Sequence, residues 1–214
     1  MSEPTPHPAQ AGRYRVLYAD PPWWERGGGR IKRGADRHYP LMKTEAICAL
    51  PVSAWMAHDA HGYLWVTNNF LPDGLRVLAA WGFRYVTKID WYKGDVSEEM
   101  DDALMDAALM AGLGQYYRGV TESCLFGVRG HTPYARLPSG TRAQGRTGFH
   151  ASRRAHSEKP EKMRTMIEYV SPALPRLEMF ARRHTPGWDV WGNEVTTIAP
   201  LEVTCDPLDT GNAL

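Results

Sequence analysis

The stretch VLYADPPWWERGGG, residues 16–29, decides the fold because a pattern typical of a buried strand ends inside it at two prolines. Residues 14–19, YRVLYA, are mostly apolar or aromatic, a pattern typical of a strand buried on both faces. Two prolines follow Asp20, and proline cannot continue a central strand because it lacks a backbone N–H donor. The sequence therefore predicts that Asp20 lies at the carboxyl end of a strand.

Helical and strand patterns alternate along the rest of the chain. A helix is expected between residues 40 and 56, beginning near Thr44 and ending at Pro51. Strands that alternate with helices predict an α/β fold with a mostly parallel central sheet flanked by helices. The other predicted strands are 61–67, 83–93, 122–130 and 175–182, and the other predicted helices are 70–82, 97–112 and 158–171.

The composition indicates one domain of moderate size. The chain has 214 residues, 43% of them hydrophobic and 23% charged, with a net charge of +1. Its three cysteines lie far apart and fit neither a zinc site nor a disulfide framework, which favours a reducing, cytoplasmic location. No apolar run approaches the roughly 20 residues that span a bilayer. We expect a disordered leader at 1–12, a single domain at 13–195 and a peripheral tail at 196–214.

Positive charge is concentrated in residues 129–157, which read as one long loop. The segment is rich in Gly, Ser and Thr and shows no apolar period over most of its length. In a nearly neutral protein, such a cluster favours a nucleic-acid contact, and a solvated flexible loop is the alternative. The candidate substrate contacts in it are Arg142, Arg146, Arg153 and Arg154.

The Asp-Pro-Pro-Trp turn suggests a site that holds a planar amino group. The prolines remove N–H donors, so the Asp20 carboxylate and the Pro21 carbonyl remain as acceptors. Accepting both amine hydrogens leaves the nitrogen lone pair free to attack an electrophile. Trp23 offers a flat face on which a base could stack, a contact that contributes about 1–3 kcal/mol. The alternative is a strand end with core tryptophans, and Trp24 fits either the core or a lid.

Several ordered blocks resemble the MT-A70-like family of adenine-N6 methyltransferases, over residues 14–194. They are ADPPW (19–23), HYPLM (38–42), LWVTNNFL (64–71), HSEKP (156–160) and LEMFARRHTPGWDVWGNEV (177–195). The resemblance implies a permuted Rossmann-like methyltransferase fold, S-adenosyl-L-methionine as cofactor and transfer of a methyl group to the N6 amine of adenine. The block GLGQYYRGVTESCLFGVRG (112–130) resembles the bacterial and phage branch, which favours DNA over RNA as the substrate.

The resemblance also assigns roles to individual positions. It implies a catalytic turn formed by Asp20, Pro21, Pro22 and Trp23. It implies that the aromatic rings of Tyr39, Tyr116 and Tyr117 contact the target base. The cofactor contacts that it implies are Asp20, Lys159, Phe180, Arg182, His184, Thr185, Asn193 and Glu194, with no metal.

Three other functions remain open at this point. RNA is the alternative nucleic acid, and a protein glutamine side chain presents an amide nitrogen that needs the same acceptors. A homologue without activity that only binds nucleic acid is the non-enzymatic alternative, against which the complete DPPW turn and the Asn193-Glu194 pair argue. A homodimer through the helix at 97–111 or the loops is also left open, and no membrane partner is expected.

Overall fold

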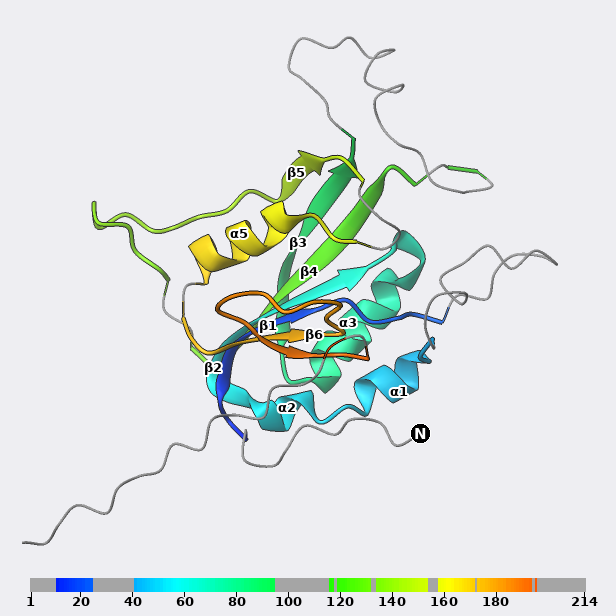
Figure 1. The fold of residues 1–214 in the computed structure, drawn as a ribbon, viewed down its shortest axis with the longest axis horizontal. Coiled ribbons are helices and arrows are strands. Elements are labelled where there is room, and N and C mark those ends of the chain that lie inside the picture. Colours follow the sequence, from blue (N-terminus) through cyan, green and yellow to red (C-terminus); the bar gives the residue numbers. More distant parts are fainter. Residues whose placement is uncertain are drawn as a thin grey trace, which may run out of the picture.

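A computed structural model describes residues 11–24, 41–94, 116–117, 119–131, 134–153, 158–171, 173–193 and 195. Its centre is a seven-stranded sheet in the order β5-β3-β4-β2-β1-β6-β7 (Figure 1). The strands are β1 (Tyr14–Ala19), β2 (Met56–Val66), β3 (Arg84–Lys93), β4 (Thr121–Arg129), β5 (Gly148–Ala151), β6 (Arg176–Met179) and β7 (Asp189–Trp191). The helices are α1 (Thr44–Cys48), α2 (Val52–Trp55), the 3₁₀ turn η3 (Asn68–Phe70), α3 (Leu71–Ala80) and α5 (Glu161–Val170).

The sheet is mixed but mostly parallel, as the sequence predicts. β1 pairs in parallel with β2 and β6, β6 with β7, and β3 with β5. β4 alone runs in the opposite direction, antiparallel to both β2 and β3. The carboxyl ends of six strands therefore share one edge of the sheet with the first residues of β4. In an open α/β sheet, ligands bind outside that edge.

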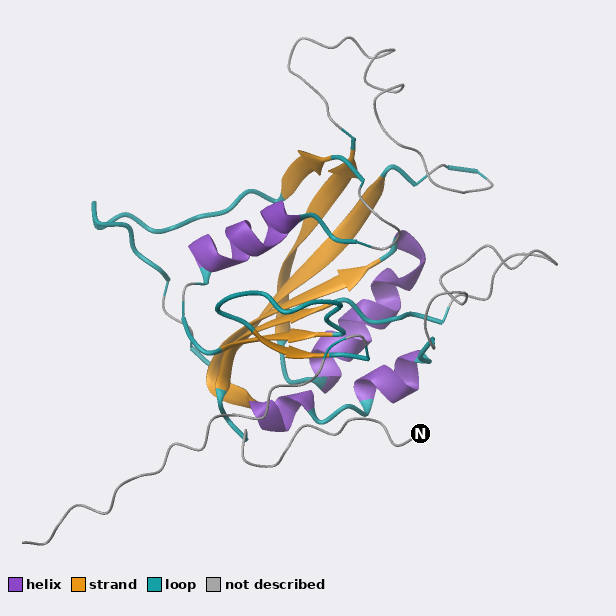
Figure 2. Ribbon diagram, viewed as in Figure 1, coloured by secondary structure: helices purple, strands orange, loops and turns teal. Residues whose placement is uncertain are grey.

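Two separate cores lie on the two faces of the sheet, and helices cover both (purple in Figure 2). Successive residues of β1 alternate between them, because side chains of a strand point to opposite faces. Leu17 packs with α1, α2 and α3, whereas Tyr18 packs with α5 on the other face. This double burial explains why residues 14–19 read as a nearly continuous apolar run.

Helix α3 approaches the sheet closely at Gly74. A Cβ atom added there would lie 2.3 Å from Cγ1 of Val66 and 2.9 Å from Cδ1 of Leu125. Both contacts are too short for a real side chain, so glycine allows the helix to rest directly on β2 and β4. The packing fixes the end of β2 beside the turn that follows β1.

Several boundaries differ from the sequence prediction. β2 begins at Met56 rather than at residue 61, because its first residues pair with β1 and extend the strand. Helix α5 begins at Glu161 after Pro160, which occupies the N-cap position. The predicted strand 175–182 ends at Met179, and Phe180 turns the chain with a positive φ of 60°. Residues 1–10 of the predicted leader 1–12, the helix 97–112 and the tail 196–214 lie outside the described residues.

The prediction of one basic loop over residues 129–157 is wrong. β5 forms inside it and pairs with the last residues of β3, from Asp90 to Lys93. Four residues are too few for a period to be visible in the sequence, and tertiary pairing with β3 decides their conformation. The segment is thus divided into a part before β5 and a part after it, which leave the sheet at opposite edges.

Candidate active site

The turn after β1 is held by backbone hydrogen bonds to a neighbouring segment. The Met42 N–H donates to the Pro22 carbonyl at 2.7 Å, and the Trp24 N–H donates to the Met42 carbonyl at 3.0 Å. The Trp23 N–H donates to the Pro21 carbonyl at 2.9 Å. A carbonyl oxygen has two lone pairs, so the Pro21 carbonyl keeps one for a further donor. The turn therefore offers one acceptor position fewer than the sequence suggested. The turn is a fixed structure rather than a flexible loop.

The expected platform role of Trp23 is not supported, because the ring is buried. Trp23 is 8% exposed, and its ring stacks on Phe70 with centroids 5.4 Å apart. Its indole N–H donates to the Trp65 carbonyl at 3.1 Å. Burial of this large apolar ring stabilises the turn and leaves little of its face open to a base. The exposed ring of the pair is Trp24, at 47%, with Lys43 Nζ 5.3 Å from its centroid.

Four charged side chains form a chain along the carboxyl edge of the sheet. Lys159 Nζ lies 2.7 Å from Oδ2 of Asp20 and 3.0 Å from Oε1 of Glu122. Lys93 Nζ lies 3.0 Å from the other oxygen of Glu122. The Lys159 ammonium also lies 5.4 Å from the Trp65 ring centroid. The side chains alternate in sign, and Asp20, with 31% of its side chain exposed, is the one most open to solvent.

The environment shifts the pKa of three of these groups. Burial raises the pKa of Asp20 above its ordinary value, with Lys159 acting in the opposite direction. Burial would also raise the pKa of Glu122, but the ammonium groups of Lys159 and Lys93 outweigh it and hold that pKa below its usual range. Burial alone would lower the pKa of Lys159, whereas the two carboxylates raise it. Glu122 and Lys159 are therefore charged at neutral pH, and the charge of Asp20 depends on Lys159.

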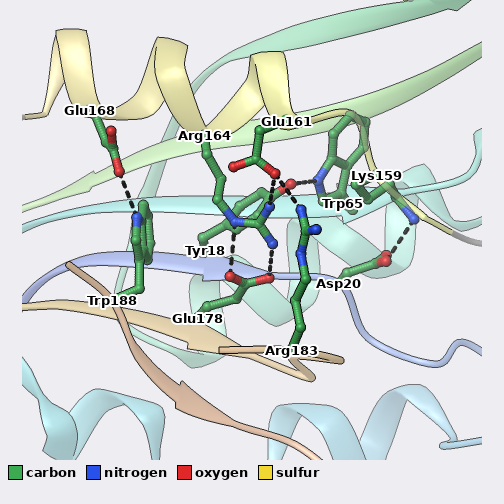
Figure 3. A network of polar contacts seen from close by, with 10 residues as sticks. All are labelled: Tyr18, Asp20, Trp65, Lys159, Glu161, Arg164, Glu168, Glu178, Arg183 and Trp188. Atoms are coloured by element: carbon green, nitrogen blue, oxygen red, sulfur yellow. Dashed lines mark hydrogen bonds and ion pairs between the residues drawn. The ribbon is translucent and has the colours of Figure 1, made fainter. Parts of the chain in front are cut away.

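Helix α5 brings Lys159 to Asp20, and a buried ion pair holds the helix on the sheet (Figure 3). Arg164 of α5 donates from Nε and Nη2 to the two oxygens of Glu178 on β6, at 3.0 Å and 2.6 Å. Both side chains are nearly inaccessible, at 8% and 7% exposure. Arg164 also binds Glu161 at 2.7 Å. The ion pair thereby anchors the start of α5 to β6, which is the strand next to β1 and to the Asp20 turn that follows it.

The candidate cofactor contacts follow β6 and β7 at the same edge of the sheet. Phe180 packs edge-on against Trp191, with centroids 5.3 Å apart. A Cβ atom on Gly192 would lie 2.4 Å from the Ala181 carbonyl oxygen, so only glycine lets these two loops meet. Arg182, His184 and Asn193 are exposed, and Thr185 is half-buried.

The donors and acceptors in this region fit S-adenosylmethionine chemically. The Asp20 carboxylate suits a cationic group, arginine and lysine suit a carboxylate, and an asparagine amide suits ribose hydroxyls. Glu194, the predicted partner of Asn193, lies outside the described residues.

The predicted substrate contacts are not all brought to this edge. Tyr116 and Tyr117 are each 92% exposed, so their rings are not packed against the Asp20 turn. Arg142 and Arg146 lie before β5, at the opposite edge, whereas the exposed Arg153 follows β5 and lies on the side of Asp20. Tyr39 and Arg154 lie outside the described residues.

Sequence reasoning missed Glu122 and Lys93. Each lies in a predicted strand, 83–93 or 122–130, to which the sequence assigned no site residue. The available signal was a carboxylate at the start of the mostly apolar run SCLFGV, residues 123–128. A charge of this kind is costly to bury without partners, so it predicts a local counter-charge.

The arrangement defines a Rossmann-like methyltransferase with an acidic turn at the carboxyl edge of its sheet. The family model described as MT-A70 matches residues 14–194, nearly the whole of the described fold, and the chain belongs to this family. The family relationship confirms the resemblance and the fold expected from it. Plant and animal relatives are named as N(6)-adenosine-methyltransferases and the Mycoplasma relative as a type II methyltransferase, and the methyltransferase family implies S-adenosylmethionine as the methyl donor.

The chain is similar to methyltransferases from bacteria, plants and animals. It is 30% identical over 202 residues to the type II methyltransferase M.MunI of a Mycoplasma species, covering 86% of this chain and 78% of that protein. It is 28% identical to a putative N(6)-adenosine-methyltransferase MT-A70-like protein of Medicago truncatula, covering 87% of this chain. The same identity and coverage of this chain hold for the Drosophila melanogaster relative. The match covers only 27% and 28% of these longer proteins.

Among the residues with a defined position, no helix is both long and apolar enough to cross a bilayer.

Proposed function

We propose that this protein transfers a methyl group from S-adenosylmethionine to the N6 amine of adenine in DNA. The observation that carries the proposal is the Asp20 carboxylate at the carboxyl end of β1, on a turn fixed by Met42. The similarity to M.MunI over 78% of that enzyme favours DNA, and RNA is the second candidate because plant and animal relatives are named for adenosine methylation. Incubation with isotope-labelled cofactor and either DNA or RNA, followed by nucleoside mass spectrometry, tests both.

In this proposal, the residues of the turn orient the target amine. The Asp20 carboxylate and the second lone pair of the Pro21 carbonyl accept its two hydrogens, which leaves the nitrogen lone pair available. Bound S-adenosylmethionine would supply the methyl group from its positively charged sulfur. Orientation by a fixed turn lowers the barrier because the entropy of alignment is lost before the reaction. The proton of the amine then leaves through Asp20 or to solvent.

Lys159 has two effects on Asp20 in this scheme. Its ammonium occupies Oδ2, so the target amine is accepted at Oδ1. The same charge favours the ionised carboxylate that the reaction needs. Glu122 and Lys93 keep Lys159 in place, since the Glu122 carboxylate forms ion pairs with both ammonium groups.

Replacing Lys159 with methionine is expected to shift the acidic limb of the pH profile of kcat to higher pH. The substitution removes the cation that lowers the pKa of Asp20, while burial and the Glu122 charge continue to raise it. Lys159→Arg keeps the charge and should retain the wild-type limb. The matched control is Lys162→Met, which changes an exposed lysine in the first turn of α5, three residues after Lys159. An acidic limb that stays in place in Lys159→Met would show that Asp20 is not the titrating group.

Replacing Trp24 with alanine is expected to raise KM for DNA by roughly ten- to hundredfold and to leave the fold intact. A base stacked on an aromatic ring contributes about 1–3 kcal/mol, and Trp24 is the exposed ring beside the turn. Trp24→Phe keeps a ring and should retain most of the affinity. Steady-state kinetics with a short duplex measures the effect, and unchanged KM in Trp24→Ala would exclude this ring from the substrate site.

The proposal extends to the domain bounds, the cellular location and the oligomeric state of the protein. We infer a single catalytic domain over residues 13–195, because both cores share the one sheet. A cytoplasmic location suits an enzyme that acts on bacterial or phage DNA. The 97–111 helix, proposed as a self-association surface, is outside the described residues, and nothing among the residues that are described adds support for a homodimer.

A further inference from the structure

The basic segment of the chain contains no acidic residue between Glu122 and Glu158. Over this distance, which includes β5, six arginines occur without a carboxylate among them: Arg129, Arg136, Arg142, Arg146, Arg153 and Arg154. β5 divides the segment, so that Arg142 and Arg146 before it and Arg153 after it lie at opposite ends of this strand. The part before β5 is left without a role by the site described above.

The part before β5 leaves the sheet at the edge opposite Asp20. Arg129, the last residue of β4, pairs with Ala60, whereas Ser123 near the start of β4 pairs with Val66 at the end of β2. The strand rises six residue steps from Ser123 to Arg129, which separates the two edges by roughly 20 Å. Gly145 packs near Val170, the last residue of α5, and not near Lys159, which precedes its first turn. Figure 1 shows the loop before β5 on the far side of the sheet from the turn that follows β1.

Residues 134–143 form an ordered hairpin rather than a free loop. The Leu137 N–H donates to the Thr141 carbonyl at 2.9 Å, and the Ala143 N–H donates to the Ala135 carbonyl at 2.8 Å. Gly140 turns the chain with a φ of +82°. Nη1 of Arg136 donates to the carbonyl of the same glycine at 2.7 Å, which closes the tip. The hairpin therefore presents its side chains in a set arrangement.

Arg142 and Tyr134 form a stacked pair on this hairpin. The guanidinium carbon of Arg142 lies 4.2 Å from the Tyr134 ring centroid, and the tyrosine is 64% exposed. Arg142 is itself exposed, and a cation–π contact does not use its N–H groups, so these donors are available to a ligand. Arg146, also exposed, follows four residues later. The acid at the root of the hairpin, Asp59, already accepts the His131 N–H at 2.9 Å and lies 2.7 Å from His58 Nδ1.

We propose that the hairpin 134–143 and Arg146 form a second nucleic-acid contact, which binds phosphates of the backbone about 20 Å from Asp20. The proposal rests on the proposed function, since it concerns the same nucleic-acid substrate. Arginine forks match phosphate oxygens, and a surface with positive charge and no acid within its sequence suits a polyanion rather than a mixed protein surface. Affinity and chemistry are then divided: the hairpin contributes binding, and the Asp20 edge contributes the reaction.

The double variant Arg142→Ala/Arg146→Ala tests this division. Fluorescence anisotropy with a 30-base-pair G·C duplex, which contains no adenine, measures binding without the reaction. At about 0.1 M salt the dissociation constant should rise by roughly tenfold. In a plot of the logarithm of the association constant against the logarithm of the salt concentration, the slope should become shallower by about 2, because two phosphate contacts are lost. With a duplex that contains adenine, KM should rise while kcat stays within about twofold. Arg146→Glu, which leaves the Tyr134 stack untouched, should weaken binding further than Arg146→Ala.

The matched control is Arg13→Ala/Arg76→Ala, which removes the same charge from arginines paired with Asp189 and Asp73. Equal weakening of the test and control variants would overturn the proposal, because net charge alone would then explain it. A loss of kcat in the test variant would also overturn it, as would conversion of a dimer to a monomer in size-exclusion chromatography. If the wild-type protein methylates neither DNA nor RNA, the proposed function fails, and the binding measurements still decide the role of the hairpin.

Discussion

Replacing Asp20 with asparagine is expected to lower kcat by roughly 10³-fold while the protein remains folded. The amide keeps the size of the side chain but offers one acceptor oxygen and no charge, so the amine hydrogen and the developing positive charge lose their partner. The loss of a single preorganised group of this kind typically costs 10²- to 10³-fold. Incorporation of labelled methyl groups under single-turnover conditions measures the effect directly.

The fold should tolerate this change because Lys159 keeps Glu122 as a second partner, at 3.0 Å. Circular dichroism and thermal melting verify this point. Asp73→Asn is the matched control, since Asp73 lies in the first turn of α3 and pairs with Arg76. Near-normal turnover of Asp20→Asn with full cofactor occupancy would remove Asp20 from the reaction and with it the proposed mechanism.

Replacing Arg164 with methionine is expected to lower the free energy of unfolding by roughly 3–5 kcal/mol. The substitution leaves the Glu178 carboxylate buried among apolar side chains without its two hydrogen bonds. For a chain of this size, the loss corresponds to a fall of roughly 10 °C in Tm. Thermal denaturation followed by circular dichroism measures it. Because α5 positions Lys159, activity should fall at temperatures below the melting transition as well.

Two further variants separate the buried charge from the loss of an arginine. Arg183→Met breaks an exposed ion pair with Glu161, formed at 2.6 Å with 53% of the Arg183 side chain exposed, and should cost no more than about 1 kcal/mol. The double variant Arg164→Met/Glu178→Leu removes both buried charges and should recover most of the stability. If the double variant is as unstable as Arg164→Met, packing rather than the unpaired charge explains the loss.

The sheet and the edge that carries the site could be predicted because the signals are local. The prolines at 21 and 22 must end β1, and the apolar run before them must be buried on both faces. Since ligands bind at the carboxyl edge of such sheets, the sequence alone places Asp20 there. The ordered blocks up to Glu194 then pointed to the family that the family model confirms.

Individual side-chain roles could not be predicted in the same way. Trp23 and Trp24 are neighbours of the same type, yet one is buried against Phe70 and the other is exposed. Which ring is covered depends on α3 and η3, more than 40 residues away in the chain, and no local pattern reports it. The same holds for Glu122, whose partners Lys159 and Lys93 come from other elements.

The sequence by itself determined the layered α/β fold, the position of Asp20 at the end of a buried strand and the concentration of arginine after β4. These follow from proline geometry, hydrophobic period and composition, which act over a few residues. Only the tertiary structure decided that β5 pairs with β3 and divides the basic segment between two edges of the sheet. Strand pairing joins residues that are distant in sequence, so its outcome depends on the partner strand and not on the local residues alone.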